Sequence, residues 1–204
     1  MDTPLVAQAG GLREIRLVGR GGTGVVTAGE LLGQAAVREE RHAQAIPTFG
    51  PERRGALSSC TLRISETPIL LKCSSTHPDI LLVIDATIWR HAPVTAGLAE
   101  GGVLVFNSTS GPDEVEKELR SGDLGYRLGV DACSIFTVDA TGIAIEFIGK
   151  PITNTTMMGA LAGATGVVGM SSLEEVLEER FGENGRKNRD AARAGKDRLR
   201  GRGG

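Results

Sequence analysis

The sequence has few residues of the kind that build a metal centre. Its three cysteines, Cys60, Cys73 and Cys133, are too far apart for a zinc knuckle or for the clustered thiolates of an iron–sulfur site. The three histidines show no metal-ligand spacing, and there is no Walker lysine and no nucleophile elbow. The sequence therefore predicts no metal site and no self-contained catalytic set.

Long apolar runs are also missing. No stretch reaches the ~18 residues that a membrane span needs, and the N-terminus has neither the basic nor the long apolar segment of a secretory signal. We therefore expect no membrane contact and a cytoplasmic protein. Aromatic residues make up only 3% of the 204 residues, but hydrophobic residues make up 40% and charged residues 24%. The last two proportions are close to globular averages and favour one folded α/β domain.

The net charge of -2 hides an asymmetry along the chain. Residues 186–204 carry eight Lys or Arg against two Asp, so the remainder is acidic. A basic segment can bind nucleic acid, but this one has no interleaved aromatic residues and no nucleic-acid-binding motif. We expect a solvated helix or a contact with another subunit there, and no nucleic-acid partner.

The first half of the chain predicts alternating strands and helices, followed by an antiparallel hairpin. A polar stretch at residues 47–55, held out of regular structure by Pro and Gly, separates the two parts. In chain order, the expected elements are a strand at 12–18, a helix at 25–37, a short strand at 42–46, and hairpin strands at 56–64 and 68–72 around a turn at 65–67.

In the second half, unbroken apolar runs at 80–84, 103–106 and 135–138 predict central parallel strands covered on both faces. The expected helices lie at 94–99, 112–120, 142–148 with Thr141 as N-cap, 155–166, and from a capping box at Ser171, Ser172, Glu174 and Glu175 to Phe181. The fold expected is α/β: a doubly wound, mostly parallel Rossmann-like sheet with an antiparallel hairpin insertion and a C-terminal helical tail. We expect a loose N-terminus at 1–11, the α/β domain at 12–182 and the basic tail at 183–204.

A Gly-x-Gly-x-x-Gly motif follows the first predicted strand and opens the first helix. We call it the glycine loop, and its residues are Gly19, Arg20, Gly21, Gly22, Thr23 and Gly24. Glycines permit a tight turn and close backbone approach, and a helix start favours a phosphate. A dinucleotide site expects an acidic residue at the end of the second strand, and none stands there. Three alternatives stay open: a phosphate or diphosphate group, NAD or FAD, and a tight turn without a ligand.

A second candidate lies in the polar stretch. Glu52, Arg53 and Arg54 stand between prolines and glycines, and paired arginines suit bidentate recognition of a phosphate or carboxylate. A solvated charge cluster explains the same residues.

Polar residues also follow the predicted parallel strands, where a doubly wound sheet places its ligand crevice. They are Asp85, Asn107, Ser108 and Asp139. Helix capping is the alternative explanation for these residues. We include Asn107 among the predicted binding residues.

Three motifs together resemble a known family. They are Gly19-Arg-Gly-Gly-Thr-Gly-Val-Val-Thr-Ala28, Phe49-Gly-Pro-Glu-Arg-Arg-Gly-Ala56, and Pro151-Ile-Thr-Asn-Thr155 with Gly159-Ala160. Their order and spacing resemble the gamma subunit of 2-oxoacid:ferredoxin oxidoreductases of the pyruvate/ketoisovalerate type. Thr23 stands where that family usually has Gln, and Pro51 departs from its Glu-Arg-Arg-Gly loop.

The resemblance implies a multisubunit enzyme that converts a 2-oxoacid to an acyl-CoA. It implies thiamine diphosphate, Mg and [4Fe-4S] clusters on alpha, beta and delta-type partner subunits, with ferredoxin or an NAD-linked flavin subunit as electron acceptor. This chain would lie at or near coenzyme A and be inactive alone, and the glycine loop with Glu52, Arg53 and Arg54 would face the coenzyme or a partner subunit. The alternatives are a free-standing nucleotide-binding oxidoreductase and a purely structural assembly subunit. Which 2-oxoacid is used is not encoded in these motifs.

Overall fold

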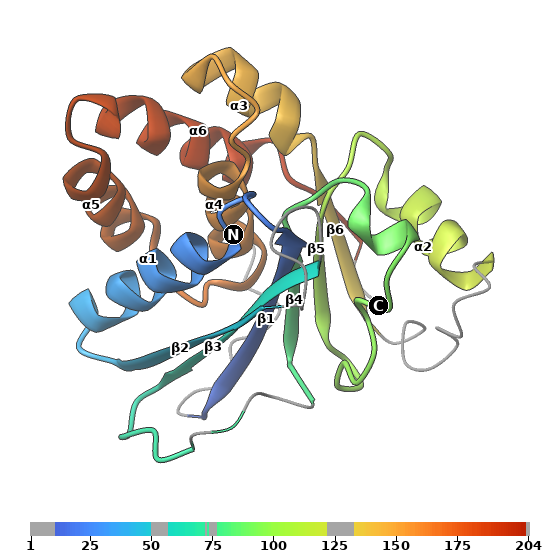
Figure 1. Cartoon of the computed structure of the whole chain (residues 1–204), viewed down its shortest axis with the longest axis horizontal. Coiled ribbons are helices and arrows are strands. Elements are labelled where there is room, and N and C mark those ends of the chain that lie inside the picture. The colour runs from blue at the N-terminus through green and yellow to red at the C-terminus, as the bar shows by residue number, and fades with distance from the viewer. Residues whose placement is uncertain (1–10, 50–56, 72, 74–76, 122–132, 203–204) are drawn as a thin grey trace.

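The computed structural model describes residues 11–49, 57–71, 73, 77–121 and 133–202. These residues form a seven-stranded sheet in the order β2-β3-β1-β4-β5-β6-β7 (Figure 1). β1, β4, β5 and β6 run parallel, while β3 and β7 are antiparallel to their neighbours. The strands are β1 (Arg13–Arg20), β2 (His42–Phe49), β3 (Leu57–Ser65), β4 (Ile80–Val83), β5 (Val103–Asn107), β6 (Ser134–Val138) and β7 (Arg200–Arg202).

Helices cover both faces of this sheet, as a doubly wound fold requires. One face lies under five helices: α1 (Val25–Arg38), α3 (Ala140–Ile148), α4 (Asn154–Thr165), α5 (Met170–Phe181) and α6 (Gly185–Asp197). The other face lies under α2 (Pro112–Ser121) and the short helix η1 (Ile88–Arg90), and a further short helix, η3 (Gly182–Asn184), joins α5 to α6. Every side chain of β4, β5 and β6 is buried, which confirms that the apolar runs are central strands. Among the described residues, no helix is long and apolar enough to cross a bilayer.

The predicted hairpin between strands at 56–64 and 68–72 is wrong. Residues 68–71 form no strand, and Leu70 is 87% exposed. Instead, β3 pairs with β1 on one side and with β2 on the other. This register places Cys60, Leu62 and Ile64 in the core with residues of α1. The need to bury that apolar face therefore determined which strands pair with β3, and the turn that follows β3 in the sequence did not.

Four further local predictions are wrong. Residues 47–49 belong to β2 and not to an irregular polar stretch, because they pair with Cys60, Ser59 and Ser58 of β3. The expected helix at 94–99 is a series of turns, because Gly97 adopts φ +76°, which interrupts a right-handed helix. The N-cap of α3 is Asp139 and not Thr141, and its Oδ1 accepts the Gly142 N–H at 2.8 Å. The expected capping box lies inside α5, which begins at Met170 without a side-chain cap.

The basic C-terminal segment folds back onto the domain. α6 packs against α4, and β7 pairs with β6 (Figure 1). Its arginines pair with acidic residues of other helices; these pairs are Arg189–Glu178, Arg193–Glu174 and Arg198–Glu146, each at 2.6 Å. Part of the charge asymmetry seen in the sequence is therefore compensated within the fold, between the C-terminal segment and neighbouring helices. The domain boundary at residue 182 stays a prediction.

Candidate functional site

The described residues bring several sequence candidates to one edge of the sheet. The glycine loop begins with the last two residues of β1, Asp85 follows β4, and Asn107 ends β5. The chain leaves β1 through α1 on one face and leaves β4 through η1 on the other, so the connections diverge between these two strands. In open α/β sheets such a switch point is where the ligand crevice forms. We call this place, between the glycine loop and residues 85–88, the β1/β4 crevice.

The glycine loop is shaped by contacts within the chain. The N–H and the hydroxyl of Thr23 donate to the Arg20 carbonyl at 3.0 and 2.8 Å. A Cβ on Gly19 would lie 2.5 Å from Thr23 Oγ1, and one on Gly24 would lie 2.5 Å from Asn154 Nδ2. Gly22 has φ +98° with open space around it. Glycine is therefore required at these positions for the turn itself, whether or not a ligand approaches.

The start of α1 has no side-chain cap. Its N-cap is Gly24, in the left-handed conformation at φ 79°, without a side-chain cap among the described residues. The first intrahelical bond joins Ala28 N to Gly24 O, so the N–H groups before Ala28 have no partner within the helix and lie at the positive end of its dipole. This arrangement suits an anion.

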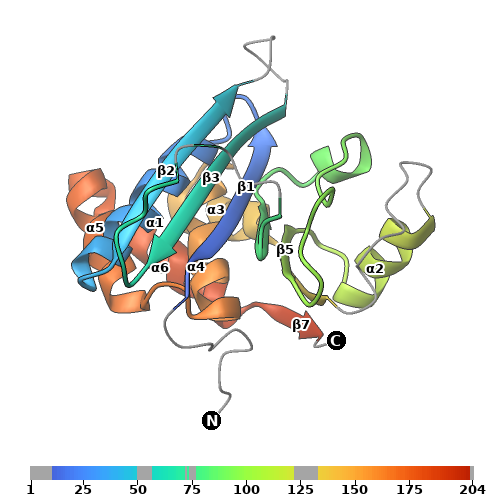
Figure 2. The same cartoon turned by 90° about the horizontal axis from the view of Figure 1, so that it is seen from below.

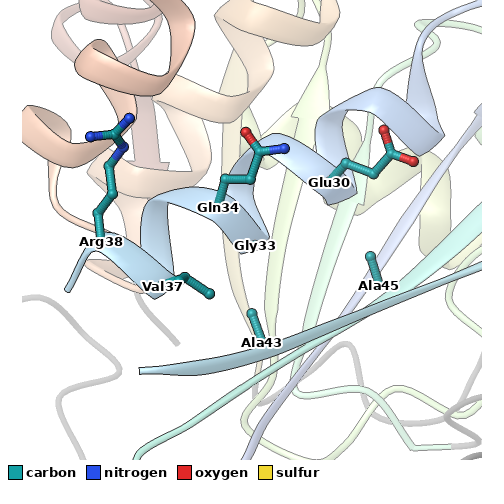
Figure 3. Close-up of a pocket in the computed structure, with 7 residues that line it drawn as sticks. All are labelled: Glu30, Gly33, Gln34, Val37, Arg38, Ala43 and Ala45. Atoms are coloured by element: carbon teal, nitrogen blue, oxygen red, sulfur yellow. The ribbon is translucent and has the colours of Figure 1, made fainter. Parts of the chain in front are cut away.

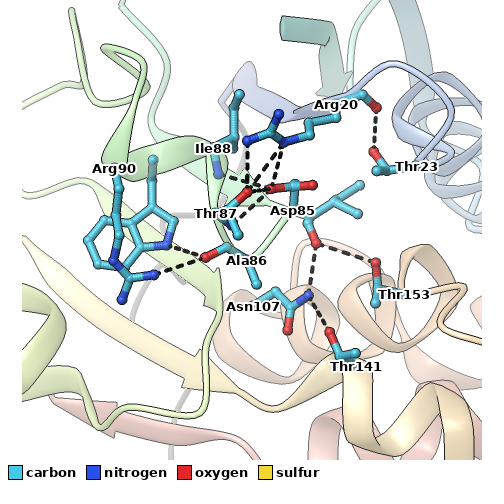
Figure 4. A network of polar contacts seen from close by, with 12 residues as sticks. Arg20, Thr23, Asp85, Ala86, Thr87, Ile88, Arg90, Asn107, Thr141 and Thr153 are labelled. Atoms are coloured by element: carbon cyan, nitrogen blue, oxygen red, sulfur yellow. Dashed lines mark hydrogen bonds and ion pairs between the residues drawn. The ribbon is translucent and has the colours of Figure 1, made fainter. Parts of the chain in front are cut away.

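Arg20 crosses the crevice and contacts the residues after β4 (Figure 4). Its Nε and Nη2 donate to Thr87 Oγ1 at 3.3 and 3.0 Å, and its Nε lies 3.5 Å from Asp85 Oδ1. Asp85 Oδ1 also accepts the Thr87 hydroxyl and the N–H groups of Thr87 and Ile88 at 2.7 to 2.9 Å. Burial alone would raise the pKa of Asp85, but these hydrogen bonds and the charge of Arg20 lower it below its usual value.

This lowered pKa makes part of the stability depend on pH. The contribution of Asp85 is fully present above the usual aspartate pKa of about 3.9 and is lost as the pH falls through the lower value of the folded protein. In urea denaturation, the difference in unfolding free energy between the wild type and Asp85→Asn should therefore shrink below about pH 4. A difference that stays constant across the acid range would show that the folded protein does not favour the ionised carboxylate.

Asn107 is buried, and its side chain is used within the chain. Its Nδ2 donates to Ile84 O and Thr141 Oγ1 at 3.0 and 3.2 Å, and its Oδ1 accepts the Ala140 N–H at 3.1 Å. The Thr153 hydroxyl donates to the same Ile84 carbonyl (Figure 4). Asn107 thus ties together the ends of β4 and β5, the start of α3 and the residue before α4.

Glu52, Arg53 and Arg54 lie outside the described residues, but the ends of their segment are placed. Phe49 pairs with Ser58, and Leu57 pairs with Arg20. Figure 2 shows β1 and β2 pointing to the same edge of the sheet while β3 runs the opposite way. Leu57, where the described chain resumes after the three charged residues, therefore lies beside Arg20 of the glycine loop, and Phe49 lies one strand further from it.

Sequence reasoning missed Thr87 and Asn154 as residues of this site. Thr87 follows Asp85 by two positions, and Asp-x-Thr is the pattern in which an Asp carboxylate accepts a nearby backbone N–H. That local signal could have identified the turn, but not its contact with Arg20. Asn154 stands in the Pro151–Thr155 motif, which is a signal for the family, but only the fold places its amide against Gly24.

A separate cleft of about 450 Å³ lies between α1 and β2 (Figure 3). It is lined by Glu30, Gly33, Gln34, Val37, Arg38, Ala43 and Ala45. Ala43 and Ala45 come from β2 and the other five from the part of α1 beyond the glycine loop, and none of them was a predicted site residue. Within the described ranges, no three His, Cys, Asp or Glu side chains gather closely enough to hold a metal ion.

Comparison with known proteins agrees with the motifs. Residues 14–198 match the family described as pyruvate ferredoxin/flavodoxin oxidoreductase. The pyruvate/ketoisovalerate oxidoreductases common subunit gamma of Thermococcus litoralis is 43% identical over 181 residues, which is 88% of this chain and 93% of the relative.

Solved structures share the fold. Pyruvate oxidoreductase subunit PORC of Thermotoga maritima superposes with a TM-score of 0.78 at 32% identity, over 93% of this chain and 98% of that chain. The 2-oxoglutarate:ferredoxin oxidoreductase of Magnetococcus marinus, determined with 2-oxoglutarate, coenzyme A and succinyl-CoA bound, superposes with a TM-score of 0.71 at 20% identity, over 91% of this chain and 30% of that chain. The Magnetococcus likeness shows the fold alone.

These matches identify the chain as a subunit and not as a free-standing oxidoreductase. The resemblance seen in the glycine loop and the Pro151–Thr155 motif is thereby confirmed. The chain belongs to the pyruvate ferredoxin/flavodoxin oxidoreductase family and is a gamma subunit of a 2-oxoacid oxidoreductase complex.

Proposed function

We propose that the β1/β4 crevice binds phosphate groups of coenzyme A in the assembled complex. The residues proposed to contact or shape that site are Gly19, Arg20, Gly21, Gly22, Thr23, Gly24, Glu52, Arg53, Arg54 and Asn107. The observation that carries the proposal is the uncapped start of α1 beside a guanidinium that crosses the crevice. Backbone N–H groups and an arginine together form a common phosphate site.

The residues present fit such a group in different roles. Arg20 is 38% exposed in its side chain, and within the described residues its Nη1 has no hydrogen-bond partner. Asn107 has no side-chain group to spare, so its role is to hold the strand ends in place. Leu57, the first described residue after Glu52, Arg53 and Arg54, pairs with Arg20, and in this proposal the two arginines would add donors. Coenzyme A is bound in the Magnetococcus enzyme, which shares the fold and is consistent with this proposal.

The remaining chemistry belongs to other subunits in this proposal. Thiamine diphosphate, Mg and the [4Fe-4S] clusters would lie on alpha, beta and delta-type partners. Ferredoxin or an NAD-linked flavin subunit would accept the electrons. The cytoplasmic location and the absence of a nucleic-acid partner remain part of the proposal, and the internal pairing of the α6 arginines supports the latter.

The test is Arg20→Gln in the complex assembled with its partner subunits. Loss of one charge-assisted hydrogen bond is typically worth ~1.5–3 kcal/mol, which corresponds to roughly 10- to 150-fold in affinity. We expect the KM for coenzyme A to rise about 10-fold or more, with an unchanged KM for the 2-oxoacid. Steady-state kinetics with pyruvate and an artificial electron acceptor measure both constants.

Arg180→Gln serves as the matched control, because it removes the same charge from an exposed position in the last turn of α5. An unchanged KM for coenzyme A in Arg20→Gln would contradict the proposal. If the variant instead fails to co-purify with its partners while any assembled complex keeps a normal KM, the crevice is a subunit contact and the chain is an assembly subunit.

A further inference from the structure

We propose that Thr87 is a positioning residue, whose hydroxyl, held by Asp85, aims the Arg20 guanidinium into the β1/β4 crevice. The inference rests on the proposed function of that crevice. It goes further by assigning a role to a residue that contacts neither the glycine loop backbone nor, in this proposal, the coenzyme.

The direction of the Thr87 hydroxyl is determined by its neighbours. An ionised carboxylate can only accept hydrogen bonds, so the 2.7 Å contact requires the hydroxyl to donate to Asp85 Oδ1. Its lone pairs then face Arg20, whose Nε and Nη2 both lie within hydrogen-bond distance. Two backbone N–H groups, from Thr87 and Ile88, hold the carboxylate in turn. The hydrogen bonds therefore run in one direction: Arg20 donates to the Thr87 hydroxyl, and that hydroxyl donates to Asp85.

These hydrogen bonds occupy only one edge of the Arg20 guanidinium, the edge formed by Nε and Nη2. In Figure 4, Nη1 of Arg20 points away from Asp85 and Thr87. The edge formed by Nη1 and Nη2 is the one that can bind two phosphate oxygens in a bidentate manner. Thr87 holds Arg20 in place before a ligand binds, so less side-chain conformational entropy of Arg20 is lost on binding.

Without the hydroxyl, Arg20 has a competing partner. Its Nε already lies 3.5 Å from Asp85 Oδ1. A valine at position 87 keeps the shape of threonine but neither accepts from Arg20 nor donates to Asp85. The guanidinium is then free to turn toward the carboxylate, and Asp85 would compete with a phosphate for it.

The experiment is a double-mutant cycle in the assembled complex, with Thr87→Val, Arg20→Gln and the pair together. Fixing one rotamer-rich side chain beforehand is worth roughly 2- to 10-fold in affinity. We expect Thr87→Val to raise the KM for coenzyme A by about that factor, with kcat at saturating coenzyme A unchanged. Thr87→Ser, which keeps the hydroxyl, should restore the KM to within about twofold of the wild type. In the Arg20→Gln background, Thr87→Val should have no further effect on the KM.

The outcomes separate the two levels of inference. If Arg20→Gln raises the KM but Thr87→Val does not, the crevice binds the coenzyme and the positioning role is overturned. Additive effects in the double variant would also overturn it, because Thr87 would then act independently of Arg20. If Arg20→Gln leaves the KM unchanged, the proposed function fails, and the role of Thr87 fails with it. Equal loss in Thr87→Val and Thr87→Ser would show that only the packing of the side chain matters.

Discussion

Glu14→Gln is expected to lower the free energy of unfolding by about 3–5 kcal/mol, because it leaves a buried arginine without its counter-charge. Arg63 of β3 is 1% exposed, and its Nε donates to Glu14 Oε1 of β1 at 2.5 Å. Its Nη1 donates to Gln44 Oε1 of β2 at 3.2 Å. The three residues stand opposite one another in the register, so one guanidinium joins three neighbouring strands.

Urea denaturation of the full chain measures this loss. Glu118→Gln is the matched control, since the Glu118–Arg90 pair has both side chains 42% exposed and such pairs contribute only about 0–1 kcal/mol. An apolar replacement of both partners, Glu14→Leu with Arg63→Met, should cost less than Glu14→Gln alone, because no charge is then left unpaired. A loss in Glu14→Gln no larger than in Glu118→Gln would contradict the expectation.

Gly159→Ala is expected to destabilise the chain by about 3 kcal/mol or more, through overpacking of α4 against α6. A Cβ at this position would lie 1.8 Å from the Ala192 carbonyl oxygen and 2.5 Å from its carbon. Both atoms are backbone, so a side-chain rotation cannot relieve the contact and α6 must move. The same interface is tight from the other helix, where a Cβ on Gly195 would lie 2.2 Å from the Thr156 carbonyl oxygen.

Thermal and urea denaturation of Gly159→Ala and Gly111→Ala make the comparison. Gly111 has no atom within 4 Å of an added Cβ, and its φ is not in the left-handed region, so its substitution should change stability little. Matching melting temperatures for the two variants would show that α6 is not closely seated on α4. A loss in Gly159→Ala alone would confirm that the basic segment is part of the folded domain.

This interface also bears on the proposed site. α4 begins at Asn154, whose amide lies against Gly24 of the glycine loop, and the Thr153 hydroxyl donates to Ile84 O at the end of β4. Displacement of α4 by an added Cβ at Gly159 would therefore be transmitted to both walls of the crevice. The C-terminal segment would therefore support the proposed phosphate site indirectly, through the position of α4.

Local chemistry explains why much of the fold could be predicted. The strand, glycine loop and helix at residues 13–38 follow from apolar alternation, glycine spacing and helical periodicity within one short segment. β4, β5 and β6 were found because strands buried on both faces are continuously apolar. The end of α3 was also correct, since Gly149 adopts the left-handed conformation at φ 81°.

Other predictions were wrong where residues far apart in the sequence determine the local structure. Residues 68–72 alternate like a strand, but β3 is already paired on both sides, with β1 and β2. The N-cap of α3 was a local error: Asp139 lies three residues before Gly142, and its carboxylate accepts the Gly142 N–H. Glu39, at the end of α1, accepts the N–H of Gly169, a contact across the fold that no capping motif indicates.

The sequence by itself determined the family, the central strands and the glycine loop, because each depends on residues that are close together in the chain. Only the tertiary structure decided that β3 lies antiparallel beside β1, which brings Leu57 next to Arg20. It also decided that Arg20 is held by Thr87 and Asp85 and that Arg63 is buried between Glu14 and Gln44. Strand order and ion pairing depend on which apolar faces can be buried together, and that condition involves the whole chain at once.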